Sequence, residues 1–191
     1  MSKNGGIIGV SDHGGWAVLV TAAREGVLLD RRRVQLVGED LPKLPHHSEG
    51  QVLPLDEAVE LVERVRASAE RYAVLALDDV TLAVPRILGV ALRNCPKLPP
   101  TIAERIKNYR AQNVADWVMY RKALALAAEA RGWPVTWYDA KSVLGAAHQA
   151  LGVENLDAHF LQVRKTVGPP WNQDHRLAMA AAIVMARAAA E

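Results

Sequence analysis

Short apolar runs separated by turn residues fill the first forty positions of the chain. The run at 7–10 leads into Gly14-Gly15, and 16–21 follows, rich in β-branched and aromatic residues. Two strands joined by a tight glycine turn account for this pattern. Over 27–37 apolar and polar residues alternate, so we expect a third antiparallel strand with one face in water.

The next segment changes from loop to helix to strand character. Three prolines within 41–54 predict a crossing loop, and apolar residues at helical spacing predict a helix over 56–71. The nearly unbroken apolar run 72–77 ends at Asp78-Asp79. This run is typical of a central strand that is covered on both faces, so we expect two acids at a strand end.

Helical and strand patterns alternate through the second half. Four prolines in 84–101 predict an irregular excursion, and the absence of Pro and Gly over 103–131 predicts one long helix or two abutting ones. A short strand is expected at 134–138 and a helix at 139–151, which Gly152 would end. The alanine-rich stretch 172–190 has strong helix propensity.

Composition limits the class of protein. With 191 residues, half of them apolar, the chain can bury a substantial core, and we expect a single domain over 1–191. Cys95 is the single cysteine, which excludes an intrachain disulfide framework and fits a reducing, cytoplasmic setting. No apolar run approaches the roughly 18 residues of a membrane helix, and the first residues lack a signal-peptide pattern. A net charge of +2 permits a nucleic-acid partner without requiring one.

The order of the expected elements indicates an α/β fold. Three antiparallel strands followed by helix–strand units give a mixed five-stranded sheet with helices on both faces, because strands separated by helices pair in parallel. This order resembles the ribonuclease H-like superfamily.

Two local motifs resemble the RuvC-like Holliday-junction resolvases. Residues 8–14 read Ile-Gly-Val-Ser-Asp-His-Gly, similar to the Ile-Gly-Ile-Asp-Pro-Gly pattern that ends the family's first strand. Residues 174–180 read Asp-His-Arg-Leu-Ala-Met-Ala, similar to the Asp-X-X-Asp-Ala-Leu-Ala pattern that opens its last helix. The resemblance implies a nuclease fold and a symmetric homodimer.

The resemblance also implies a metal site. In the family, acids at the end of the first strand, near the end of the fourth strand and at the start of the last helix hold two divalent metals. The matching positions here are Asp12, Asp78 or Asp79, and Asp174, as ligands for Mg²⁺ or Mn²⁺, with His175 as a further catalytic candidate. Two such ions activate water and stabilise the leaving oxygen in phosphodiester cleavage, and they require several carboxylate oxygens.

Two positions depart from the family pattern. Ser11 stands where the family's first acid would be, and Asp12 follows one residue later, where strand geometry turns its side chain to the opposite face unless a bulge or an early strand end intervenes. Leu177 stands at the second acidic position of the last helix. The acids also have structural explanations, namely hairpin turns, strand ends and helix dipoles.

Basic and aromatic residues offer contacts to nucleic acid. Arg164 and Lys165 precede the last helix, Lys141 follows the last expected strand, and Trp171 could stack on a base. Further candidates for phosphate contacts are Arg31, Arg32, Arg33, Arg105, Lys107, Arg110, Arg121 and Lys122. The alternative is an ordinary solvated surface with the tryptophans in the core. By the same reasoning, His46-His47 is interpreted as a solvated pair and not as a metal site.

Three functional hypotheses follow. The first is a divalent-metal-dependent nuclease that hydrolyses phosphodiester bonds in DNA or RNA, branched substrates included. The second is a catalytically degenerate member that keeps the fold as a nucleic-acid-binding or protein-interaction module, as the residues at 11 and 177 suggest. The third, an actin-like phosphate-binding relative, needs a second domain for which this chain is too short.

Overall fold

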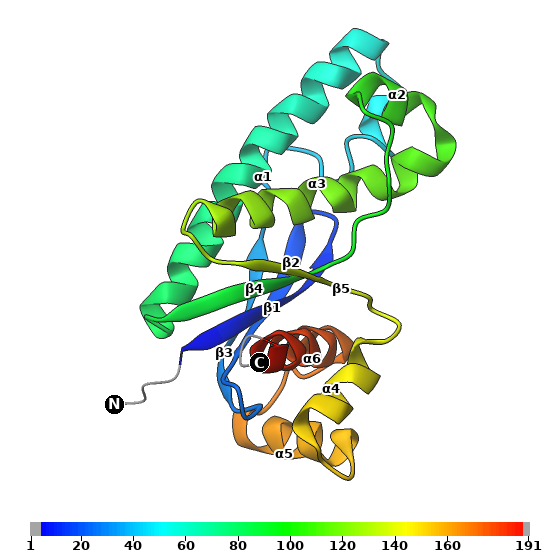
Figure 1. Ribbon diagram of the computed structural model, residues 1–191. Helices are drawn as coiled ribbons and strands as arrows, with labels where there is room; N and C mark the ends of the chain where they lie inside the picture. Colours follow the sequence, from blue (N-terminus) through cyan, green and yellow to red (C-terminus); the bar gives the residue numbers. More distant parts are fainter. Residues whose placement is uncertain (1–4, 189–191) are drawn as a thin grey trace.

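A mixed five-stranded sheet forms the centre of the protein (Figure 1). The computed structural model describes residues 5–188, and the strand order across the sheet is β3-β2-β1-β4-β5. β1 pairs antiparallel with β2 and parallel with β4, which confirms the predicted sheet. The strands are β1 Gly6–His13, β2 Trp16–Ala22, β3 Leu28–Gln35, β4 Ile87–Arg93 and β5 Val135–Tyr138.

Helices cover both faces of this sheet. Figure 1 shows α1 and α3 on one face and α6 on the other, where α4 and α5 pack outside it. The helices are η1 Glu49–Gln51, α1 Leu55–Ala83, α2 Ile102–Lys107, α3 Tyr109–Glu129, α4 Val143–Leu151, α5 Leu156–Val167 and α6 Gln173–Ala188. Among the described residues, no helix is both long and apolar enough to cross a membrane.

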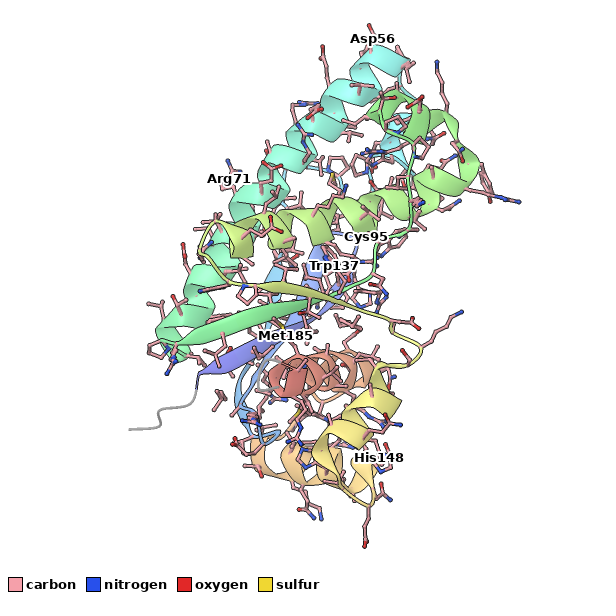
Figure 2. The ribbon with its side chains drawn as sticks, in the orientation of Figure 1. Asp56, Arg71, Cys95, Trp137, His148 and Met185 are labelled. Atoms are coloured by element: carbon pink, nitrogen blue, oxygen red, sulfur yellow. The ribbon has the colours of Figure 1, made fainter. Side chains whose placement is uncertain are left out.

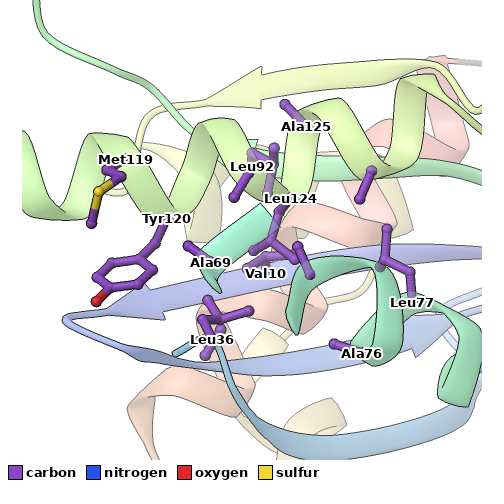
Figure 3. Packing of buried hydrophobic residues seen from close by; sticks show 14 of the residues in the cluster. Val10, Leu36, Ala69, Ala76, Leu77, Leu92, Met119, Tyr120, Leu124 and Ala125 are labelled. Carbon is purple, nitrogen blue, oxygen red and sulfur yellow. The ribbon is translucent and has the colours of Figure 1, made fainter. Parts of the chain in front are cut away.

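Alternation along β1 divides its side chains between the two faces. Ile8 and Val10 are buried in the apolar cluster formed with α1 and α3, of which Figure 3 shows a part. Ile7 belongs to the second cluster, formed with α6. A Cβ placed on Gly9 would lie 1.8 Å from the carbonyl oxygen of Ala178, so α6 rests directly on the backbone of β1. This close contact brings the start of α6 beside the end of β1.

The strand predicted at 72–77 is wrong, because α1 continues through this run to Ala83. Ala73, Ala76 and Leu77 are buried while residues 74 and 75 are exposed, so the run follows the period of a helix packed on one side (Figure 3). A short apolar run does not by itself separate these two alternatives.

The fourth strand lies instead at Ile87–Arg93, where an irregular excursion was expected. Pro85 and Pro96 fall outside the ends of this strand, so neither removes a hydrogen bond from the sheet. The long helical stretch is two helices that meet at Asn108, whose side chain caps α3. α5 was not predicted from the sequence; Asn155 caps it by accepting a hydrogen bond from the backbone N–H of Ala158.

Candidate functional site

A serine, a histidine and an aspartate meet where β1 ends beside the first turn of α6. Ser11 Oγ donates a hydrogen bond to Asp174 Oδ1 over 2.9 Å, and His13 Nε2 lies 2.8 Å from the same oxygen. Ser11 and His13 reach Asp174 because alternate residues of β1 face α6. The Asn172 side chain accepts from the backbone N–H of Asp174 and so fixes the start of the helix.

The order of contacts in this cluster excludes a nucleophilic relay. In a serine–histidine–aspartate triad the histidine lies between the other two groups and takes the proton from the hydroxyl. Here the carboxylate of Asp174 lies between Ser11 and His13, and the serine hydroxyl is directed at it. The cluster therefore positions side chains and a negative charge and does not activate the serine.

An aromatic and cationic stack extends from this cluster across the sheet. The His13 ring stacks on Trp16 with centroids 4.0 Å apart and planes 5° apart. The Arg33 guanidinium carbon lies 4.0 Å from the centroid of the Trp16 ring. A hollow of about 370 Å³ adjoins the stack, and Arg31, Asn172 and His175 also line it. This part of the face therefore combines cations, an indole and hydrogen-bonding groups.

Arg31 connects β3 to the segment between α5 and α6. Its guanidinium donates to the carbonyl oxygens of Val167 over 2.8 Å and Gly168 over 3.0 Å, and also to those of Pro169 and Pro170. Arg31 is thereby occupied with protein acceptors. Burial, helped by the positive charge of Arg31, lowers the pKa of His175 below its usual value, so this histidine is neutral near pH 7.

A second hollow lies between α5 and α6. It measures about 410 Å³, and its lining includes Phe160, Arg164, Trp171 and Arg176. The Trp171 ring is tilted against Phe160, with centroids 6.4 Å apart, and Arg176 forms an ion pair with Asp157. The structure thus brings together two predicted nucleic-acid residues, Arg164 and Trp171.

The other two predicted nucleic-acid residues are also on the surface. Lys165 is exposed on α5 next to Arg164. Lys141 is exposed in the turn before α4, where its backbone N–H is bonded to the side chain of Asp139. Arg121, also considered for phosphate contact, is buried and unavailable for that role.

Asp12 does not join the cluster at α6. The strand continues regularly through His13, so Asp12 faces α3 and its Oδ2 accepts a hydrogen bond from Arg121 Nε over 2.8 Å. Asp12 is 1% exposed, and Arg121 also donates to the carbonyl oxygen of Asn94 over 2.9 Å. The expectation that Asp12 converges with Asp174 is wrong, because no bulge or early strand end returns it to that face.

Asp78 and Asp79 are likewise far from a strand end. Both are exposed on α1, and Asp78 forms an ion pair with Arg131. α1 covers the face of the sheet opposite α6 (Figure 1), so these acids do not converge with Asp174.

The end of the fourth strand carries an arginine. Gly89 packs against Met185 of α6, which Figure 2 labels beneath the sheet, and Ala91 belongs to the same apolar cluster. By the same alternation Arg93 is on the α6 face of β4, where it lies opposite Tyr138 of β5. Burial raises the pKa of the Tyr138 hydroxyl to about 12, and this hydroxyl donates to the carbonyl oxygen of Val10 over 2.6 Å.

These residues do not fit a pair of divalent metal ions. The three places at which the resemblance implies acids hold Ser11, Arg93 and Asp174, and Leu177 packs into the apolar cluster. Hard cations need several carboxylate oxygens converging on one point, and an arginine beside them repels the metal. Among residues 5–188, no group of three or more His, Cys, Asp or Glu could hold a metal ion.

Two features of the molecule were not found from the sequence. The contacts of Ser11 and His13 with Asp174 span more than 160 positions, and only the period of β1 pointed to a shared face. The interpretation of His46 as solvated is wrong: it is 1% exposed and bonded to Asp116.

The strand order and the helices on both faces define a ribonuclease H-like fold. Among solved structures, the RuvC protein of Thermus thermophilus in complex with a Holliday junction substrate aligns over 97% of this chain and 95% of its own, with a TM-score of 0.52 and 18% identity. Another Thermus thermophilus RuvC structure aligns over 96% of this chain and 94% of its own, with a TM-score of 0.49 and 17% identity. No family model and no curated protein matches the sequence. The likeness to RuvC is one of fold.

Proposed function

We propose that this protein is a RuvC-like module that binds nucleic acid and does not cleave it by a two-metal mechanism. The observation that carries the proposal is the composition of the face at α6. A serine and an arginine occupy the strand ends at which metal-binding acids would be needed, and Asp12 is used on the other face in an ion pair with Arg121.

The basic and aromatic surface supports the binding role. Arg33 and Arg164 lie at the two hollows beside α6, and Lys165 is exposed next to Arg164. Cations contact phosphates and fix the register of a bound nucleic acid, while aromatic rings near them can stack on bases. The similar RuvC protein is described in complex with a Holliday junction, so a four-way DNA junction is the first ligand to test.

The alternative is the metal-dependent nuclease. Asp174 at the start of α6 favours it, because this is one position where the resemblance implies a metal ligand. A single carboxylate that already accepts from Ser11 and His13 leaves Mg²⁺ or Mn²⁺ without the other oxygen ligands. The homodimer implied by the resemblance stays a prediction.

The test is fluorescence anisotropy with a labelled four-way junction and a linear duplex, in EDTA and at several salt concentrations. We expect binding that survives EDTA. Three phosphate contacts would make it about 40-fold weaker between roughly 50 and 200 mM salt. Arg164→Ala should weaken binding and lower the salt slope by about one, whereas Arg64→Ala, exposed on α1 across the sheet, should change neither.

Three results would overturn the proposal. The first is binding that Arg64→Ala and Arg164→Ala reduce equally, and the second is no binding at all. The third is junction cleavage in Mn²⁺ that Asp174→Asn abolishes, which would establish the nuclease instead. Running the binding and cleavage assays on the same protein preparation distinguishes these outcomes.

A further inference from the structure

A buried histidine–aspartate pair lies at the end of the molecule where the loop after β3 meets α3. His46 Nδ1 lies 2.7 Å from Asp116 Oδ1, and the side chains are 1% and 0% exposed. The Asp116 carboxylate also accepts from the backbone N–H groups of His46 and His47 over 3.1 and 3.2 Å. Because Asp116 acts as an acceptor in these contacts, the proton of a neutral His46 ring lies on Nδ1.

This arrangement fixes the character of the other ring nitrogen. In this neutral form, with its one proton on Nδ1, the Nε2 atom of His46 presents a lone pair and accepts a hydrogen bond. Nε2 is buried and has no hydrogen-bond partner among the described residues. Buried polar atoms are nearly always bonded, so an acceptor left without a donor indicates that something else supplies one.

His46 lines a cavity of about 200 Å³ between α1, α2 and α3. Part of its wall is apolar, formed by Val62, Ile102, Val118, Met119, Ala123 and Leu126, and part is charged, formed by Arg66, Glu70, Arg105 and Lys122. The two arginines at this cavity already have partners in the protein. Arg66 pairs with Glu63 and Glu70, and Arg105 donates to the carbonyl oxygens of Pro99 and Pro100.

We propose that this cavity binds a small apolar molecule that carries one hydroxyl group, such as a phenol. The hydroxyl would donate to His46 Nε2, and the ring would contact Val118, Met119 and Ala123. The size fits, because an apolar cavity of about 150 Å³ accommodates benzene. At Nε2 itself a hydroxyl fits better than a carboxylate, because the lone pair needs a donor and the Asp116 charge behind it repels an anion, while the cations Arg66, Arg105 and Lys122 line other parts of the wall. The site lies on the side of the sheet opposite α6 (Figure 1).

The test titrates phenol into the full chain and follows the His46 ring nitrogens and the Val118 and Met119 methyl groups by NMR. Toluene serves as the matched probe without the hydroxyl. We expect saturable shifts at Nε2 and nuclear Overhauser contacts from phenol to both methyls. Loss of one hydrogen bond predicts that toluene binds about tenfold more weakly.

A cavity-filling variant locates the site. Ala123→Leu adds bulk inside the cavity and should abolish the phenol shifts, while Ala130→Leu, exposed at the end of the same helix, should leave them unchanged. The proposal fails if phenol leaves Nε2 unshifted, which would point to a bound water only. It also fails if toluene binds as tightly as phenol, a comparison that holds even if Ala123→Leu does not fold.

Discussion

Replacing Arg121 with methionine should destabilise the protein strongly, because the Asp12 carboxylate would remain buried without its cation. Asp12 is 1% and Arg121 7% exposed, and their Oδ2 and Nε atoms are 2.8 Å apart. The second oxygen, Oδ1, is buried and has no hydrogen-bond partner among the described residues, so the arginine is the main compensation for this charge. Removing one member of such a pair costs about 3–5 kcal/mol.

This cost is large compared with the total stability of a domain, which is about 5–15 kcal/mol. For a chain of this length each kcal/mol moves the melting temperature by about 2–4 °C, so Arg121→Met should melt roughly 6–20 °C lower. Urea unfolding followed by circular dichroism gives the free energy directly. Asp79→Asn is the matched control, because its exposed carboxylate should change stability by no more than about 0.5 kcal/mol.

A double variant separates charge burial from lost packing. Asp12→Leu combined with Arg121→Met removes both charges and should recover most of the lost stability, because apolar replacements of a buried pair are often neutral. The reasoning is refuted if Arg121→Met costs less than about 1 kcal/mol, or if the double variant is no more stable than the single one.

Two further predictions concern α6. Gly9→Ala should cost about 3 kcal/mol in urea unfolding, because its Cβ would meet the backbone of Ala178. The control is Gly145→Ala, whose Cβ meets nothing within 4 Å and which should stabilise the protein by about 0.5 kcal/mol. Equal effects of the two substitutions would contradict the close contact between Gly9 and α6. Burial and Arg31 lower the pKa of His175 in the folded protein below the usual value of 6.5. Below pH 6.5 the unfolded chain therefore binds a proton at His175 that the folded protein does not bind, so the stability of the wild type falls with the pH. His175→Gln should therefore lose less stability than the wild type between about pH 7 and pH 5, and unfolding midpoints that fall equally would exclude this role.

Local signals were sufficient for the hairpin, for β5 and for the mixed sheet. Gly14-Gly15 lies in the turn between β1 and β2, and the alternation around Arg31, Arg32 and Arg33 matches an edge strand. The alternation of β1 places Asp12 on the face opposite Ser11, whereas the predicted metal site needed a bulge or an early strand end to bring Asp12 to Asp174. The turn and the alternation are set by residues that are close together in the sequence, so short sequence patterns are enough to predict them.

Other features depend on packing that adjacent residues do not reveal. The run at 72–77 has the composition of a buried strand, but it continues α1, which packs on α3 with one side and leaves Val74 and Leu75 exposed. The wrong strand at 72–77 led to Asp78 and Asp79 being placed in the site, and it concealed the true strand end at Arg93. His46 is buried because Asp116 lies beside it, and these residues are 70 positions apart.

Calorimetric titration of Mn²⁺ determines whether the face at α6 holds a pair of divalent metals. The wild type and Asp174→Asn should give the same heats without saturable binding, because Ser11 and Arg93 replace the required acids. Saturable binding in the wild type that Asp174→Asn removes would show a metal site at this face and favour the metal-dependent nuclease.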